Sequence, residues 1–373
     1  MQGVRVIKPF RLDIPQADLD DLQARLDRTR FAEELPGAGG DYGVPVSRVR
    51  ALVERWRDGF DWRAPEARIN AHPQFITEID GHDVHFLHVR SPEPDAFPLV
   101  LTHGWPGTIV EYLDVIGPLT DPRAHGGDPA TAFHLVIPSI PGFGPSGPTT
   151  ERGWNRYRVA AAWAELMARL GYERYGAVGN DGGSFVSPEL GRIAPDRVAG
   201  VHVTQIFSFP SGDPAELADL TEDEQAAIAH LQWFWENMGA FNQLQAQQPQ
   251  TLAHAMADSP AGVAGWFGQL LGEDVDLDFA LANIAMHWLC GTTASSMRFY
   301  YEDAKATPPT GPTTVPIGLA QFGNDFKSIR RFAERDHARI AAWNTYDQGG
   351  HYAAHQVPAL LIGDVRAFFA GLR

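Results

Sequence analysis

The segment YGAVGNDGGSFV, residues 175–186, decides the fold that this sequence predicts. An apolar run ends in a Gly-rich turn around Asp181, and residues 184–193 have the composition of a helix. Small residues stand two positions before and two positions after the aspartate, at Gly179 and Gly183. That spacing is typical of a nucleophile elbow, in which a strained strand-to-helix turn exposes its central side chain.

The central residue of this turn is an aspartate rather than a serine. A carboxylate is already ionised, so it can attack a carbon electrophile without a base of its own, and the resulting ester must then be hydrolysed by activated water. The start of the following helix favours the negative charge. A simple helix N-cap at Asp181 is the alternative interpretation of the turn taken alone.

Runs of apolar residues on both sides of the turn extend the pattern into a βαβα alternation. Such an alternation predicts an α/β protein with a mostly parallel sheet flanked by helices. Together with the elbow, it favours the α/β-hydrolase fold. Strands are expected at residues 74–80, 83–90, 98–104, 133–142, 175–181, 198–205 and 315–322, with a hairpin turn at Gly81-His82, and helices at 15–29, 46–57, 157–171 and 184–193.

The alternation stops between residues 206 and 305, where helical patterns take over. Thr221 and Glu224 form a capping box that starts one of these helices. A Pro-rich stretch then leads back into the last expected strand. The sequence thus predicts an N-terminal arm with the first strands at 1–95, the first part of the hydrolase core at 96–205, an inserted helical cap at 206–305 and the second part of the core at 306–373.

A second motif, HGWPG at residues 103–107, follows an earlier strand. A turn of this kind can aim backbone N–H groups at a developing negative charge. The N–H groups of Trp105 and Gly182 are the expected donors of such an oxyanion hole. A plain turn is the alternative for this motif, and the GFG turn at 142–144 is expected to flank the pocket.

A third motif, Gly-Gly-His at residues 349–351, lies near the C-terminus. The hydrolase fold orders its catalytic residues as nucleophile, acid and histidine, which makes His351 the candidate base. Asp325 follows the strand predicted at 315–322 and is the candidate acid, with Asp347 as the fallback. His355 is expected on the following helix, away from the chemistry.

Composition excludes several other classes of function. The formal net charge of −16 argues against a nucleic-acid partner and against an anionic membrane surface. The sequence has no metal-ligand spacing, phosphate loop or dinucleotide fingerprint, so cofactor-free chemistry is expected. Cys290 is the only cysteine and is expected to be structural, in an apolar helix interior. No signal peptide or membrane span is expected, so the interpretation is a cytoplasmic protein.

The chain resembles the epoxide hydrolases of the microsomal and juvenile-hormone type over nearly its whole length. The resemblance implies an Asp nucleophile that opens the epoxide, a His with an acid that hydrolyses the ester, and cap-domain tyrosines that protonate the epoxide oxygen. Asp181, Asp325 and His351 match the triad. The matching segments are FDWR at 60–63, FITEIDGHDVHFLHVRS at 75–91, HGWPG at 103–107, IPSIPGFGPSG at 137–147, PQTLAHAMADSPAGVAGW at 249–266, SSMRFYYED at 295–303 and GGHYAAHQVP at 349–358.

The resemblance also assigns the pocket above the nucleophile. Tyr300 matches one ring-opening tyrosine, and its neighbour Tyr301 would point about 100° away on a helix. The position of the other tyrosine holds Phe241, which has no hydroxyl. Phe241 is expected to shape an aromatic substrate pocket with Trp105, Tyr301 and two tryptophans of the cap, Trp233 and Trp235.

Gly182 departs from the family as well, because relatives usually have a bulky residue there. Its N–H group survives the change, and the open floor suggests a large or flat, possibly polycyclic, hydrophobic epoxide from bacterial secondary metabolism. A homodimer is left open. A haloalkane-type dehalogenase with the same nucleophile is one alternative, weakened because Gly182 has no side-chain N–H for halide. A catalytically weak ligand-binding relative is the other, supported only by Phe241.

Overall fold

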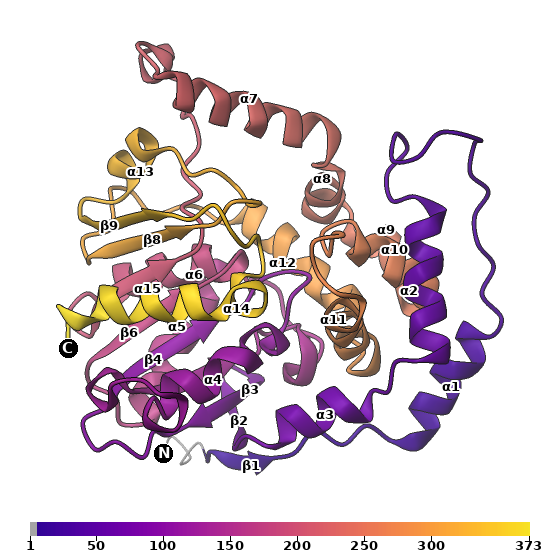
Figure 1. Cartoon of the computed structure of the whole chain (residues 1–373), viewed down its shortest axis with the longest axis horizontal. Coiled ribbons are helices and arrows are strands. Elements are labelled where there is room, and N and C mark those ends of the chain that lie inside the picture. The colour runs from indigo at the N-terminus through magenta and orange to yellow at the C-terminus, as the bar shows by residue number, and fades with distance from the viewer. Residues whose placement is uncertain (1–5) are drawn as a thin grey trace.

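A single sheet of nine strands runs through the computed structural model, which describes residues 6–373. Its strand order is β1-β2-β3-β5-β4-β6-β7-β8-β9 (Figure 1). Strands β1 to β3 pair antiparallel and β3 pairs antiparallel with β5, whereas all pairs from β5 to β9 are parallel. The strands are β1 (Lys8–Phe10), β2 (Gln74–Ile79), β3 (His82–Val89), β4 (Phe97–Thr102), β5 (Phe133–Pro138), β6 (Tyr175–Gly179), β7 (Val198–Val203), β8 (Ile317–Gln321) and β9 (Ile340–Thr345).

Helices cover both faces of the sheet (Figure 1). Helices α4 and α15 lie on one face, and α5 and α6 lie on the other. The α-helices are α1 (Gln16–Leu26), α2 (Val46–Asp58), α3 (Arg63–Asn70), α4 (Leu113–Thr120), α5 (Arg156–Arg169), α6 (Gly182–Ile193), α7 (Glu222–Asn237), α8 (Ala240–Gln247), α9 (Pro249–Asp258), α10 (Pro260–Gly268), α11 (Leu277–Leu289), α12 (Thr293–Lys305), α13 (Arg330–Asp336), α14 (Ala353–Gln356) and α15 (Pro358–Ala370). The short 3-10 helices are η1 (Ile109–Tyr112), η2 (Arg123–His125), η3 (Pro129–Thr131), η4 (Gly144–Ser146) and η5 (Pro214–Leu217).

Glycines in the central strands allow α15 to approach the sheet closely. A Cβ atom added at Gly176 of β6 would lie 2.3 Å from the ring of Phe369, and one at Gly318 of β8 would lie 2.5 Å from Phe368. Both phenylalanines belong to α15, so their rings occupy the space that larger strand residues would fill. Helix α15 is therefore packed tightly against the parallel strands, and one of these strands, β6, leads directly into the Asp181 turn.

The hairpin between β2 and β3 turns one residue earlier than Gly81-His82. Ile79 pairs with His82, which leaves Asp80 and Gly81 as the two turn residues. Both have positive φ angles, 50° and 78°. A two-residue turn with two positive φ angles matches the twist of the flanking strands, which is why Asp-Gly is favoured there. The prediction of a hairpin is confirmed, and its position is corrected.

Several predicted strands end earlier than their apolar runs. The strand predicted at 98–104 ends at Thr102, and the one at 133–142 ends at Pro138. The residues beyond both ends form loops at the carboxyl edge of the sheet instead. The elbow helix begins at Gly182 rather than at residue 184.

The N-terminal arm contains more helix than the sequence predicted. Residues 30–70 were expected to hold one short helix, yet α3 follows α2 within that range. Trp62 precedes α3, and its indole N–H donates to Glu66, whose carboxylate also accepts the backbone N–H of Ile14. These tertiary contacts stabilise a short helix that eight residues alone would not form. Residues 1–5 of the predicted arm lie outside the described residues.

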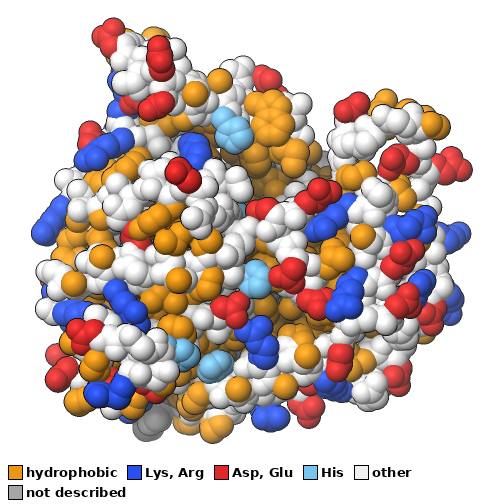
Figure 2. Space-filling model, viewed as in Figure 1, with side chains coloured by type: hydrophobic (Ala, Val, Ile, Leu, Met, Phe, Trp, Pro, Cys, Tyr) orange, Lys and Arg blue, Asp and Glu red, His pale blue; other side chains and the backbone are white. Residues whose placement is uncertain are grey.

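Helices α7 to α12 lie between β7 and β8, where the helical insertion was expected. The capping box at Thr221 and Glu224 is confirmed. Helix α7 projects from the body and has no buried residue (Figure 1). Figure 2 shows hydrophobic side chains in the hollow between α7 and the loop that joins α1 to α2. The exact limits of the four predicted segments stay predictions. None of the helices in residues 6–373 has the length and apolarity needed to cross a membrane.

Candidate active site

Asp181 lies in a strained turn between β6 and α6. Its φ and ψ angles are 50° and −114°, a conformation that residues with a Cβ atom rarely adopt. The glycines beside it leave no room for side chains. A Cβ at Gly179 would lie 2.1 Å from the carbonyl oxygen of Gly183, and one at Gly183 would lie 1.8 Å from that of Thr102. The small residues of the motif are therefore required by steric contact with backbone atoms.

Two backbone N–H groups face the carboxylate of Asp181. The N–H of Trp105 donates to Oδ1 at 2.8 Å, and the N–H of Gly182 also stabilises the charged form. Gly104 makes this approach possible, because a Cβ there would lie 2.1 Å from Oδ1. Burial raises the pKa of the Asp181 carboxyl above its ordinary value, against the attraction of His351 and these two hydrogen bonds. The structure thus brings together the candidate nucleophile and the two expected oxyanion donors.

His103 fixes the loop that carries Trp105. It is fully buried, and burial lowers its pKa to about 4, so the ring is neutral. Its Nε2 accepts the backbone N–H of Ile140 at 3.1 Å, and its Nδ1 therefore carries the proton and donates to the carbonyl of Gly104 at 3.0 Å. The two loops at the carboxyl ends of β4 and β5 are held together by this ring.

His351 lies between the two candidate carboxylates. Its Nδ1 is 2.9 Å from Oδ1 of Asp325, and its Nε2 is 3.6 Å from Oδ2 of Asp181. Burial lowers the pKa of His351, but its hydrogen bond and ion pair with Asp325 and the charge of Asp181 outweigh burial and raise the pKa to about 9. Asp347, the fallback acid, makes no hydrogen bond or ion pair to His351 within the described chain.

Glu111 is a buried carboxyl group that sequence reasoning missed. Its side chain is 1% exposed, and the side-chain amide of Asn180 donates to its Oε2 at 3.5 Å. Burial raises the pKa of Glu111 to about 8, so the acid is neutral at neutral pH. Its sequence signal was its place four residues after the HGWPG motif, on the turn that also bears Tyr112.

Gln205 was also missed, because it was taken as the last residue of the strand predicted at 198–205. It is fully buried and lies two residues beyond the end of β7. Its side-chain amide contacts both the Asp181 turn and Asp325. A single polar residue at the carboxyl end of a parallel strand was the available signal, since ligand and catalytic groups gather at that edge of such sheets.

Three aromatic rings pack above Asp181. The ring of Trp105 stacks on Phe241 with centroids 5.7 Å apart, and Tyr300 meets both rings edge-on at 5.7 and 5.9 Å. Burial, together with the charge of Asp181, raises the pKa of the Tyr300 phenol well above its ordinary value. The phenol is therefore a neutral hydrogen-bond donor near Asp181. Tyr300 belongs to α12 and Phe241 to α8, both within the helical insertion between β7 and β8.

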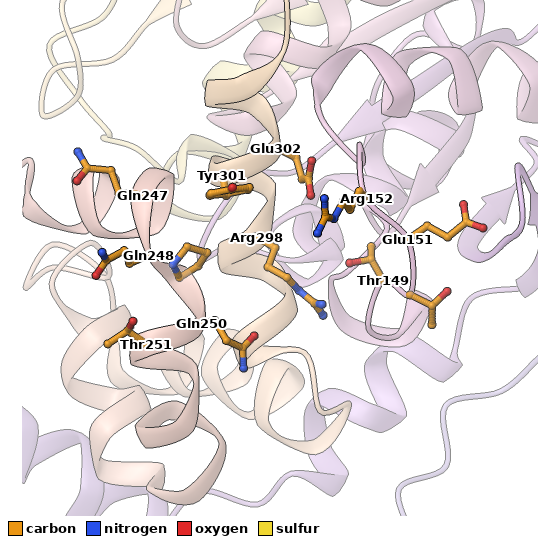
Figure 3. Close-up of a pocket in the computed structure, with 12 residues that line it drawn as sticks. Thr149, Glu151, Arg152, Gln247, Gln248, Gln250, Thr251, Arg298, Tyr301 and Glu302 are labelled. Atoms are coloured by element: carbon orange, nitrogen blue, oxygen red, sulfur yellow. The ribbon is translucent and has the colours of Figure 1, made fainter.

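The other predicted substrate-binding aromatics do not join this cluster. Tyr301 lines a separate surface cavity of about 570 Å³, with Arg298 and residues 149–152 (Figure 3). Trp233 is 51% exposed and stacks on His230. Trp235 is 37% exposed. Substrate contacts by these three residues stay predictions.

A second set of aromatic rings packs around the loop that follows β7. Phe207, in the loop after β7, stacks on Phe185 of α6 at 4.4 Å and packs against Phe326 at 5.0 Å. Phe209 contacts Phe326 and reaches Trp235 of α7. Phe326 directly follows Asp325 in the sequence. This second set therefore includes the residue next to the candidate acid.

Two residues that were expected to lie outside the chemistry have surroundings that fit a structural role. Cys290 caps the C-terminal end of α11 rather than lying in a helix interior, and burial raises the pKa of its thiol to about 12. The thiol is therefore not a nucleophile at neutral pH. His355 bridges Asp114 and Asp276 and stacks on Phe279.

Family models match the chain in two overlapping parts. Residues 98–352 match the model described as alpha/beta hydrolase fold, and residues 7–112 match the one described as epoxide hydrolase N terminus. The first match confirms the α/β-hydrolase fold.

Similar proteins narrow the class further. The chain is 41% identical to a putative epoxide hydrolase from Stigmatella aurantiaca, over 98% of this chain and 86% of that protein. It is 30% identical to juvenile hormone epoxide hydrolase 1 of Ctenocephalides felis, over 96% and 84%. It superposes on the Aspergillus niger epoxide hydrolase with a TM-score of 0.86 at 28% identity, covering 99% and 97% of the two chains. The Bombyx mori juvenile hormone epoxide hydrolase has the same fold, with a TM-score of 0.88 at 22% identity.

The chain therefore belongs to the epoxide hydrolase family of the α/β-hydrolase fold. Enzymes of this family are hydrolases that act on ether bonds, and the predicted enzyme class is confirmed.

Proposed function

We propose that this protein hydrolyses a hydrophobic epoxide to a vicinal diol through a covalent ester on Asp181. The observation that carries the proposal is the different surroundings of the two carboxylate oxygens. Oδ1 accepts the N–H of Trp105 at 2.8 Å, whereas Oδ2 lies 3.6 Å from His351. Oδ1 is thus held as the oxygen that later becomes the oxyanion, and Oδ2 is left to attack carbon.

Ring opening begins when Oδ2 attacks one carbon of the epoxide and the bond between that carbon and the epoxide oxygen breaks. The oxygen takes a proton from the phenol of Tyr300, the buried donor beside Asp181. Phe241 packs edge-on against Tyr300 and supplies no second proton. A single donor therefore supports this step.

The charges around His351 determine when it can act as the base for the second step, ester hydrolysis. In the free enzyme, Asp325 and Asp181 keep His351 protonated, with a pKa raised to about 9. Esterification neutralises Asp181, so the pKa of His351 falls and the imidazole releases its proton. That proton goes to the Tyr300 phenolate, which lost its own proton to the epoxide oxygen, so the phenol is restored. His351 becomes a base at the stage that requires one.

Ester hydrolysis then restores the starting state. Neutral His351 takes a proton from water, and the water oxygen attacks Cγ of Asp181. The negative charge that develops on Oδ1 faces the N–H groups of Trp105 and Gly182, which is the arrangement that stabilises an oxyanion. As the ester bond between Cγ and Oδ2 breaks, the leaving oxygen takes the proton of the newly formed carboxyl group. The diol leaves, Asp181 is again a carboxylate, and His351 keeps the proton that it took from water.

The pocket walls support a flat, apolar and possibly polycyclic epoxide as the substrate. Trp105, whose N–H contacts Asp181, stacks on Phe241, and partly buried Phe185, Phe207 and Phe326 form a second aromatic set that includes the residue after Asp325. Aromatic rings favour offset-stacked and edge-on contacts with other rings. A Cβ at Gly182 would lie 3.2 Å from Gly104, so a larger residue there would press on the oxyanion loop.

Oxygen labelling tests the ester. The protein is mixed in excess with an aryl-substituted epoxide in ¹⁸O-labelled water, and the peptide that contains Asp181 is analysed by mass spectrometry. The label is expected in the Asp181 carboxylate, because water attacks Cγ. Label found only in the diol after a single turnover would show direct hydration and overturn the proposal.

A further inference from the structure

The side-chain amide of Gln205 connects the Asp181 turn to the loop of Asp325. Its Oε1 accepts the backbone N–H of Asp181 at 2.9 Å, and its Nε2 donates to Oδ2 of Asp325 at 2.5 Å. The other oxygen of Asp325, Oδ1, faces Nδ1 of His351 at 2.9 Å. Gln205 therefore contacts the backbone of the nucleophile and the acid that orients the base.

The orientation of this amide is fixed by its neighbours. A backbone N–H can only donate, so the carbonyl end must face Asp181, and an ionised carboxylate can only accept, so the NH₂ end must face Asp325. Ser184 adds a hydroxyl donor to Oε1 at 2.9 Å, and Nε2 also donates to Oδ1 of Asn180 at 2.9 Å. A carboxylate or a hydrocarbon of similar size could not satisfy both ends.

We propose that Gln205 is a positioning residue that holds Asp325 and the Asp181 turn in register for ester hydrolysis. The inference rests on the proposed covalent mechanism. Burial raises the pKa of Asp325, but its interactions with His351 and the hydrogen bond from Gln205 outweigh burial and keep it below the ordinary value. With Oδ2 occupied by Gln205, Asp325 presents Oδ1 to His351 in one geometry.

Two substitutions test the contributions of the acceptor end and the donor end of the amide separately. Gln205→Glu keeps an acceptor for the N–H of Asp181 but loses the donor to Asp325, where two carboxyl groups would have to share a proton. A hydrogen bond to a charged group contributes enough to slow a step by about tenfold or more when it is lost. Ester hydrolysis is expected to slow by about that factor, and ring opening by less. Gln205→Met loses both the acceptor for Asp181 and the donor to Asp325. Ring opening and ester hydrolysis should therefore both slow, and ester hydrolysis should again slow more.

The measurement is the ratio of the two rate constants, obtained by rapid quench from the rise and decay of the Asp181 ester. A residue that only supports the fold would lower the fraction of active sites and leave this ratio unchanged. The matched control is Gln74→Glu, because Gln74 is a buried amide that bridges Asn70 and His85 away from the site. The control is expected to keep the wild-type ratio.

The outcomes separate the inference from the mechanism beneath it. A lower ratio in either Gln205 variant, with the control unchanged, supports the positioning role, and Gln205→Met serves if Gln205→Glu does not fold. A wild-type ratio in a folded Gln205 variant that forms the ester overturns this inference alone. A wild-type protein that forms no ester overturns the proposed function, and the inference with it.

Discussion

Nε2 of His351 lies 3.6 Å from Oδ2 of Asp181, close enough for the charge of one to set the protonation of the other. At the same time, Nδ1 of the same ring is 2.9 Å from Asp325. His351 thus stands between two negative charges, of which the proposed reaction removes one. The first two predictions follow from this arrangement.

Removing the base should trap the ester. In His351→Gln, Asp181 still has its backbone donors and can attack the epoxide, but no group accepts the proton of water. A positioned general base contributes on the order of 10²–10⁴-fold, so ester hydrolysis should slow by that amount. Intact-protein mass spectrometry should show one substrate mass added per chain. A variant with normal turnover and no adduct would remove His351 from the base role.

The pH dependence of ester hydrolysis should reveal the change at His351. The pKa of His351 is about 9 in the free enzyme, and loss of the Asp181 charge lowers it in the ester. Because neutral His351 is the base, the hydrolysis rate should rise with pH and reach half its maximum below about 9. Single-turnover decay over a pH series gives this midpoint, and NMR titration of the imidazole gives the free-enzyme value. Equal midpoints would contradict the proposed timing.

Glu111 should make stability depend on pH. Its pKa is raised from 4.5 to about 8 in the folded protein, so the folded state keeps a proton that the unfolded state loses between these values. Stability therefore falls as pH rises through that window. Glu111→Gln, a neutral isostere, should gain stability relative to the wild type across this window, by on the order of 4–5 kcal/mol for a shift of this size. Urea unfolding at both ends of the window measures the difference, and a constant difference would contradict the raised pKa.

Tyr300 and Phe241 should have opposite effects on ring opening. Tyr300→Phe removes the buried donor and should slow ester formation by roughly 10²–10³-fold. Phe241→Tyr adds a hydroxyl to a ring that lies 5.9 Å from Tyr300 and should speed ester formation. Rapid-quench measurement of ester formation tests both. If Tyr300→Phe formed the ester at the wild-type rate, the proton donor would have to be another group.

Two glycines should respond to alanine in opposite directions. A Cβ at Gly183 would lie 1.8 Å from a backbone oxygen, so Gly183→Ala should destabilise the protein by about 3 kcal/mol or more and abolish activity. Gly363 lies inside helix α15 with nothing within 4 Å of an added Cβ, so Gly363→Ala should stabilise the protein by about 0.5–1 kcal/mol. Thermal unfolding of both variants compares them, and a stable, active Gly183→Ala would contradict the required tight turn.

The local sequence determined the framework of this protein. The spacing of Gly179, Asp181 and Gly183 predicted the elbow, because only small residues clear the backbone atoms that the structure places beside them. The capping box at Thr221 and the Asp80-Gly81 hairpin have equally local causes. Apolar runs predicted the parallel strands, since strands buried on both faces have no polar face to preserve.

The tertiary structure alone decided how distant residues meet. Glu111 and Gln205 belong to no motif, and their importance comes from contacts with residues far along the chain, such as the 120-residue separation between Gln205 and Asp325. The neutral state of Glu111 and the raised pKa of His351 arise from burial and from neighbouring charges, which composition does not reveal. The sequence by itself named the nucleophile, the base and the acid as candidates. Only folding brings Asp325, His351 and Asp181 next to one another, because the carboxyl ends of parallel strands meet at the same edge of the sheet.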